Sequence, residues 1–224
     1  MMTGGLFRQL EQRPRLSLAL ALAAGLALTW VLQTRPPPTK ALRLTPVVES
    51  VLTDTGSPRL GATHPDVIVV VFTDYRCAIC RKTDPALARL LATDPGVQVI
   101  YKDWPILGEQ SLVGARIALA AHQLGRYAQM HRVLMAERGP LSLETVPRLA
   151  DQAGVDPKAL TAVLESQGEA IEAQLNRHRA QAFALGLQGT PAYLVGPYLI
   201  QGGLDDGKLA ALVTRARRSG PPKP

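Results

Sequence analysis

The feature that most constrains the fold is a run of β-branched residues that leads directly into a pair of cysteines. The run "VIVVVF", Val67–Phe72, is typical of a central strand buried on both faces of a sheet. It continues into "TDYRCAICRK", which holds Cys77 and Cys80, the two cysteines of the chain. We expect a helix from Cys77 onward and a second strand at Val97–Trp104. A strand, a helix and a strand in this order imply parallel strands joined by a right-handed crossover.

The remaining pattern predicts an α/β domain with helices between two groups of strands. Residues 47–53 are interpreted as a short edge strand, and residues from about 105 to 186 have helical spacing. Strand character returns at Pro191–Val195, followed by a turn, a short return strand and a closing helix. One sheet covered by helices accommodates this order.

The N-terminal region predicts a membrane anchor. Leu16–Leu32 is 17 residues without a charge, and as a helix it would span roughly 25 Å, near the lower limit for a bilayer. Basic residues precede it, which places residues 1–15 in the cytoplasm and the rest of the chain on the exported side. A cleaved signal peptide is the alternative, but the bulky Trp30, Val31 and Leu32 near its end favour an uncleaved, single-pass anchor. The proline-rich residues 33–46 are expected to form a stiff linker.

The charge distribution argues against nucleic acid as a partner. The formal net charge is +7, but residues 1–45 carry six basic residues and one acidic residue. This leaves 19 of the 25 basic and 17 of the 18 acidic residues for the exported part, which is almost balanced. A nucleic-acid-binding domain is expected to concentrate a basic excess on one face.

Two non-redox interpretations of the cysteine pair are disfavoured. A structural zinc site needs four ligands, and His64, His122, His131 and His178 do not include two within five residues of each other. A purely structural disulfide between Cys77 and Cys80 would close so short a loop that it would remove little chain entropy. Neither a metal nor a cofactor is therefore expected.

The redox interpretation has a physical mechanism. A cysteine pair that follows a strand and opens a helix lies against free backbone amides and the positive end of the helix dipole, which stabilise a thiolate. Reactive cysteines in such settings have pKa values of roughly 3.5 to 7.5 instead of about 8.5. Cys77 is predicted to be the exposed nucleophile, and Cys80, one turn into the helix, is predicted to be buried and to resolve the mixed disulfide.

These segments resemble the thioredoxin superfamily and, within it, the DsbA-type thiol:disulfide oxidoreductases. "VVVFTDYRCAICRK" is similar to the active-site strand and helix of the family, "YKDWPILGEQS" to a recurring segment, and "LGLQGTPAYLVG" to the cis-proline loop. The resemblance covers residues 47–218, followed by a flexible tail at 219–224. It implies a thioredoxin-like fold with a helical insertion over about 105–186, preceded by the transmembrane helix. It also implies a cis Thr190–Pro191 bond beside the cysteines, where an extended substrate chain can pair with the backbone of Thr190.

The sequence departs from the family pattern in two places. Ala-Ile stands between the cysteines, where many relatives have proline first and strongly oxidising ones have histidine second. Val71 stands six residues before Cys77, where several relatives carry a buried acid that assists proton transfer. Asp74 and Asp103 are the nearest substitutes, but each is interpreted as a strand-end or capping residue.

The resemblance implies a membrane-tethered enzyme with its catalytic domain in the periplasm. Its partners would be exported proteins with cysteines and a membrane redox partner that reoxidises or reduces the pair. An oxidase is favoured, and a disulfide reductase in the same compartment is the alternative. A non-enzymatic chaperone or Cu(I) carrier using Cys77 and Cys80 as ligands is a further alternative, which no Met-rich stretch supports.

Overall fold

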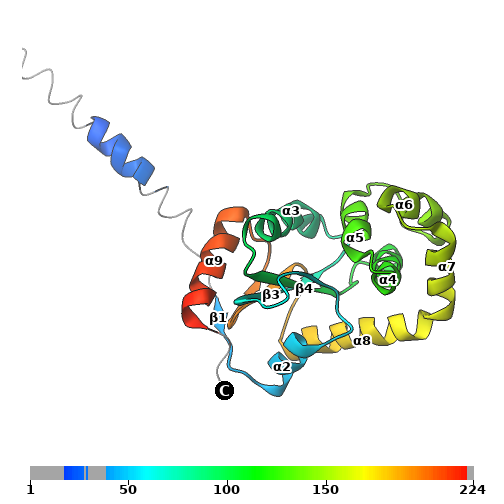
Figure 1. Cartoon of the computed structure of the whole chain (residues 1–224). Helices are drawn as coiled ribbons and strands as arrows, with labels where there is room; N and C mark the ends of the chain where they lie inside the picture. The colour runs from blue at the N-terminus through cyan, green and yellow to red at the C-terminus, as the bar shows by residue number, and fades with distance from the viewer. Residues whose placement is uncertain (1–17, 28, 30–38, 221–224) are drawn as a thin grey trace, which may run out of the picture. The chain divides into compact units, whose positions relative to one another are not determined.

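The computed structural model describes residues 18–27, 29 and 39–220. The chain divides into two units, residues 1–36 and 37–224. In the first unit, residues 18–27 and 29 are helical (Figure 1). Within the described ranges, no helix has the combination of length and hydropathy that a membrane crossing requires. The predicted anchor, residues 16–32, lies partly outside the described residues, and the predicted tail at 1–15 lies wholly outside them.

The described part of the second unit contains a six-stranded mixed sheet with the order β1-β6-β5-β3-β4-β2. The strands are β1 (Lys40–Ala41), β2 (Arg59–Gly61), β3 (Val67–Thr73), β4 (Val97–Asp103), β5 (Ala192–Val195) and β6 (Tyr198–Gln201). The central strand β3 pairs parallel with β4 and antiparallel with β5. Helix α3 (Ala78–Thr93) connects β3 to β4, which confirms the predicted strand–helix–strand unit.

The β-branched run forms a strand because both faces of the sheet are covered. Val69 and Val71 belong to the core on the side of α3 and α9 (Asp206–Ser219). Val70 and Phe72 belong to the core on the opposite side, together with residues of α2 (Pro46–Thr53) and α8 (Gly168–Ala184). Successive strand residues point to opposite faces, so burial of both faces favours the uninterrupted apolar run Val67–Phe72.

The expectation of an edge strand at residues 47–53 is wrong, because this segment is the helix α2. The Thr45 side chain accepts a hydrogen bond from the Val48 amide at 3.3 Å and caps the helix, and Pro46 occupies the first turn, where it suits a helix. Val48 and Val51 are three residues apart and both buried, so the helix places them on one face against the sheet. The β-branched composition suggested a strand, but the cap and the spacing of the buried residues decide for a helix.

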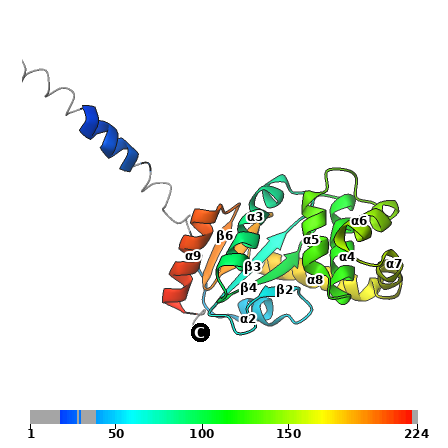
Figure 2. The same cartoon turned by 45° about the horizontal axis from the view of Figure 1, so that its top comes forward.

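The helical block predicted over about 105–186 runs from Glu109 to Ala184 and lies beside the sheet and α3 (Figure 2). It contains α4 (Glu109–Gln123), α5 (Tyr127–Ala136), the short 3-10 helix η1 (Leu143–Thr145), α6 (Val146–Ala153), α7 (Pro157–Ser166) and α8. Ile117, Met130 and Leu149 from this block belong to the same buried cluster as Val69 of β3. The block therefore shares the core of the sheet and is not a detached domain.

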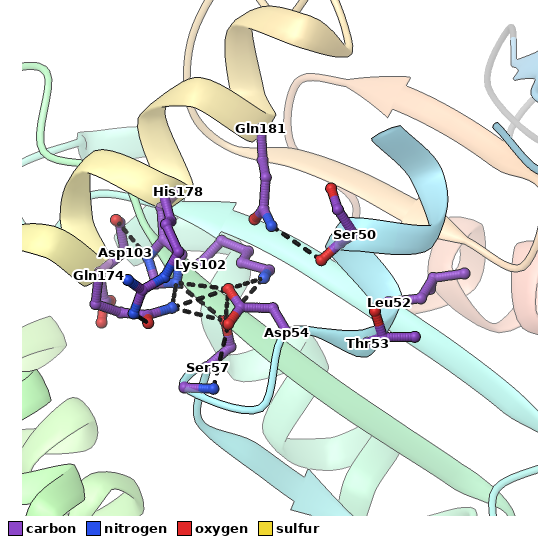
Figure 3. A network of polar contacts seen from close by, with 12 residues as sticks. Ser50, Leu52, Thr53, Asp54, Ser57, Lys102, Asp103, Gln174, His178 and Gln181 are labelled. Atoms are coloured by element: carbon purple, nitrogen blue, oxygen red, sulfur yellow. Dashed lines mark hydrogen bonds and ion pairs between the residues drawn. The ribbon is translucent and has the colours of Figure 1, made fainter. Parts of the chain in front are cut away.

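A buried polar network fixes α8 and the end of α2 to the sheet (Figure 3). Lys102 of β4 is fully buried, and its Nζ lies 2.8 Å from Asp54 Oδ2 and donates to Ser57 Oγ at 2.8 Å. From α8, Gln174 Nε2 donates to Asp54 Oδ2 at 2.9 Å, and His178 lies 3.0 Å from Ser57 Oγ. The sequence analysis did not anticipate this network, because its members are separated by up to 124 positions.

Candidate active site

The turn that carries the cysteines is held by a buried carboxylate. Asp74 directly follows β3, and its Oδ1 accepts hydrogen bonds from the Arg76 amide at 2.8 Å and from Ser111 Oγ at 2.7 Å. Its Oδ2 accepts from the amides of Ile106 and Leu107 at 2.8 and 3.2 Å. Asp74 therefore ties the turn before α3 to the start of the helical block. The interpretation of Asp74 as a strand-end residue fits these contacts.

Cys77 is the N-cap residue of α3, and its sulfur takes the place of a capping oxygen. The Sγ accepts a hydrogen bond from the Cys80 amide at 3.4 Å, and its thiol donates to the Thr190 carbonyl at 3.3 Å. Both cysteines are free thiols in this structure. A sulfur at this position faces unsatisfied amides and the positive end of the helix dipole, and both stabilise a thiolate.

The burial of the two sulfurs differs in part from the prediction. Cys77 is only 7% exposed and Cys80 is 2% exposed. The prediction of an exposed Cys77 is wrong, because the backbone of Thr190 lies against its sulfur. The prediction of a buried Cys80 is confirmed. Burial raises the pKa of Cys80 to about 12, and Cys77 adds to the increase.

The Thr190–Pro191 bond is cis, as expected, and directly precedes β5. Pro191 is buried. The fold thus brings Thr190 to the cysteine pair across 113 positions of sequence. All four residues that the sequence analysis selected, Cys77, Cys80, Thr190 and Pro191, lie in this one region.

The position six residues before Cys77 holds no acid, since Val71 is buried in the apolar core. The fold instead buries Asp103, the last residue of β4, which pairs in register with Thr73. Its Oδ1 accepts a hydrogen bond from the Tyr127 hydroxyl at 3.1 Å, while its Oδ2 has no partner among the described residues. Burial raises the pKa of Asp103 to about 6, and His131 and two tyrosine hydroxyls oppose this increase.

Asp103 belongs to a buried network that ends beside the cysteine helix. The Tyr75 hydroxyl donates to Tyr127 at 3.3 Å and lies 2.9 Å from Nδ1 of His131. Nε2 of His131 lies 2.8 Å from Asp84, which is four residues after Cys80 on α3. No sequence pattern singled out Tyr75, Asp84 or Tyr127, and His131 was considered only as a zinc ligand. The only local signal was the four-residue spacing of Tyr127 and His131, which places both on one face of a helix.

We expect Asp103→Asn to become more stable than the wild type as the pH rises. A folded-state pKa of about 6 lies above the ordinary value of 3.8, so the buried carboxyl costs stability as pH rises through this window. The Asn variant lacks this cost, so its unfolding free energy should gain about 2 kcal/mol on the wild type between pH 4 and pH 7. Urea unfolding at four pH values measures the difference, with the exposed Asp151→Asn as control. If the unfolding free energies of Asp103→Asn and the wild type changed in parallel with pH, the raised pKa of Asp103 would be contradicted.

Metal binding has no candidate cluster in the described part of the chain. Among residues 18–27, 29 and 39–220, no three His, Cys, Asp or Glu side chains are grouped so that they could hold a metal ion.

The sheet, the cysteine pair at a helix N-terminus and the cis-proline loop define a thioredoxin-like thiol:disulfide oxidoreductase. Residues 68–211 match the DSBA-like thioredoxin domain, so the chain belongs to this family. It is similar to a thioredoxin-like oxidoreductase from Silicibacter pomeroyi, with 37% identity, a TM-score of 0.71, and coverage of 76% of this chain and 97% of that one.

Other solved structures agree with the family. The thiol-disulfide exchange protein alpha-DsbA2 from Wolbachia pipientis is 28% identical with a TM-score of 0.71, covering 75% of this chain and 90% of that one. The catalytic domain of Proteus mirabilis ScsC is 26% identical with a TM-score of 0.69, covering 76% of this chain and 94% of that one.

A curated protein, Na(+)/H(+) antiporter NhaA 1 from Salinispora arenicola, is 25% identical over 158 residues, which make up 70% of this chain. The chain spans about a quarter of the length of the curated relatives that it matches.

Proposed function

We propose that the chain exchanges disulfides with exported proteins through Cys77 and Cys80, and that it acts as an oxidase. The observation that carries this proposal is the position of the Cys77 sulfur, which accepts the Cys80 amide at the start of α3 and lies against the Thr190 carbonyl. Cys77 is the sulfur that meets the substrate, and Cys80 is the resolving sulfur behind it.

The proposed reaction starts from a disulfide between Cys77 and Cys80. A substrate thiolate attacks the Cys77 sulfur, the Cys77–Cys80 bond breaks, and Cys80 leaves as a thiolate that takes up a proton. The high pKa of Cys80 favours this uptake. A second substrate thiolate attacks the substrate sulfur of the mixed disulfide, and Cys77 leaves as a thiolate at the helix N-terminus. Two electrons pass from the substrate to the pair, and a membrane redox partner would accept them.

Thr190 and Pro191 are proposed to form the substrate-binding loop. The Thr190 backbone already touches the Cys77 sulfur. An extended substrate segment that pairs with this backbone would bring its own cysteine next to Cys77.

Oxidase and reductase directions are distinguished by the reduction potential and by the state of the thiols in cells. No histidine stands between the cysteines, so we expect a potential between those of thioredoxin, about −270 mV, and DsbA, about −120 mV. Equilibration with glutathione measures the potential, and alkylation of trapped cell extracts measures the thiol state. A pair found oxidised in cells supports the oxidase. A pair found reduced, with a potential near that of thioredoxin, would overturn it in favour of a reductase.

We propose an export topology in which residues 1–15 are cytoplasmic, 16–32 form a single-pass anchor, and 33–46 link it to a periplasmic domain, with Lys40–Ala41 of this link joining the sheet as β1. The uncharged run after basic residues supports this topology. Reporters fused after Pro46 should be active only outside the cytoplasm, and a mature protein that begins after residue 30 would show cleavage instead. The antiport named for the curated relatives is not proposed for this chain, which spans only about a quarter of them.

A further inference from the structure

Two arginines flank the cysteine pair, and each donates a hydrogen bond to a backbone carbonyl. Arg76 directly precedes Cys77, and its Nη1 donates to the Gly139 carbonyl at 3.0 Å. Arg81 directly follows Cys80, and its Nε donates to the Met135 carbonyl at 3.1 Å. The accepting carbonyls of Met135 and Gly139 lie at or just after the end of α5. A carbonyl oxygen carries only a partial negative charge, so neither bond neutralises a guanidinium group. α3 and α5 lie next to each other in both views (Figure 1, Figure 2).

The guanidinium groups are close enough to affect one another. Burial lowers the pKa of Arg81, and the positive charges of Arg138 and Arg76 lower it further. Nη2 of Arg81 is buried and has no hydrogen-bond partner within the described ranges. The negative charge of Glu137 opposes this decrease in pKa, and a further anion would relieve the remaining repulsion.

A hollow next to these residues extends the positive charge. It has a volume of about 520 Å³ and is lined by Arg132, Arg138 and Arg148, together with Val133, Ala136, Glu137 and Gln152. The one carboxylate in this lining is already engaged: Glu137 accepts the Gly139 amide at 2.6 Å and lies 2.6 Å from Arg148. We call Arg76, Arg81, Arg132, Arg138 and Arg148 together the arginine surface.

Two arginines elsewhere on the surface are paired with acids. Arg217 contacts Asp66 and Asp94 at 2.8 and 3.0 Å, and Arg89 contacts Asp206 at 2.8 Å. The exported part is almost neutral as a whole. The arginine surface is therefore a local concentration of charge beside the reactive sulfurs, and not a reflection of the net charge.

We propose that the arginine surface binds acidic residues that flank the target cysteine of a polypeptide substrate. This inference rests on the proposed function and names its substrate class. Because Arg76 and Arg81 adjoin the two cysteines in sequence, a substrate cysteine at Cys77 would hold its neighbours within a few residues of the guanidinium groups, at about 3.3 Å per extended residue. Positive charge around a reactive site raises the rate of encounter with anionic partners. An anionic membrane is the less favoured partner, because docking through this face would cover the cysteine pair.

The test compares three peptides with one cysteine each, flanked on both sides by Asp, Asn or Lys, in exchange with the full-length oxidised protein. We expect the acidic peptide to react about tenfold faster than the neutral one at low ionic strength, and the difference to disappear in 0.5 M salt. Arg132→Gln/Arg138→Gln should remove most of this preference and leave the reduction potential unchanged. Arg179→Gln, an exposed arginine on α8, is the matched control and should keep the preference.

The outcomes separate this inference from the proposed function. If no peptide exchanges with the wild type, the proposed function fails. If all three peptides react at one rate, exchange stands and the inference about acidic substrates is overturned. Binding to vesicles of anionic phospholipid that depends on Arg132 and Arg138, without any peptide preference, would overturn it in favour of a membrane surface.

Discussion

Cys77→Ser is expected to reduce disulfide exchange to the uncatalysed background, whereas Cys80→Ser is expected to accumulate mixed disulfides with substrates. Without Cys77, the remaining sulfur is 2% exposed, and burial, the largest cause of the raised pKa of Cys80, still favours the thiol at neutral pH. Because the thiolate is the nucleophile, this sulfur cannot replace Cys77. Without Cys80, Cys77 still forms a bond with the substrate, but no internal sulfur displaces it.

Insulin reduction and refolding of a reduced substrate protein measure the exchange, and non-reducing electrophoresis of cell extracts measures the mixed disulfides. The Cys77→Ser/Cys80→Ser double variant sets the background of both assays. Equal accumulation of mixed disulfides by the two single variants would contradict the division of roles.

Asp54→Ala is expected to lower the free energy of unfolding by about 3 to 5 kcal/mol, because it leaves a buried charge without its partner. The Lys102 side chain has no exposed area, and its ammonium lies 2.8 Å from Asp54. Burial lowers the pKa of Lys102 to about 8. Burial alone would raise the pKa of Asp54, but the hydrogen bond and charge of Lys102 hold it well below its ordinary value. His178 is no substitute, since burial lowers its pKa to about 3 and leaves it neutral.

A double variant separates the cost of an unpaired charge from the value of the pair. Asp54→Ala/Lys102→Met removes both charges, and we expect it to recover most of the stability lost in Asp54→Ala. The exposed pair of Asp66 and Arg217 is the control: Asp66→Ala should cost much less stability than Asp54→Ala, because solvent screens the pair. Chemical denaturation of the four proteins measures these differences. A loss of less than 1 kcal/mol in Asp54→Ala would show that Lys102 is solvated or paired elsewhere.

The buried pair also holds distant parts of the fold together. Asp54 follows α2, Lys102 lies on β4, and Gln174 and His178 lie on α8 (Figure 3). The carbonyl of Asp103, next to Lys102, accepts a hydrogen bond from His178 Nδ1 at 3.0 Å. Loss of the pair is therefore expected to loosen the contact of α2 and α8 with the sheet.

The sequence by itself determined the elements whose signals are local. The run Val67–Phe72 predicted the buried central strand, because a strand covered on both faces needs apolar residues at every position. The cysteine pair after this run indicated a helix N-terminus and its chemistry. The cis bond before Pro191 was implied by the resemblance of its segment to the family's cis-proline loop. These features depend on residues within one turn or one strand of each other.

Only the tertiary structure decided which distant groups meet. The prediction of a strand at residues 47–53 is wrong. The valines favour β structure, but the N-cap at Thr45 and the burial of one helix face stabilise the helix instead. The sequence left Asp103 as a capping candidate, but its contacts with Tyr127, and through Tyr75 with His131, come from packing α5 against β4. A near-neutral composition likewise concealed the arginine surface. A local sequence pattern predicts whether a residue is buried. It does not predict the partner of a buried charge, because that partner is the nearest polar group in space, which can be distant in sequence.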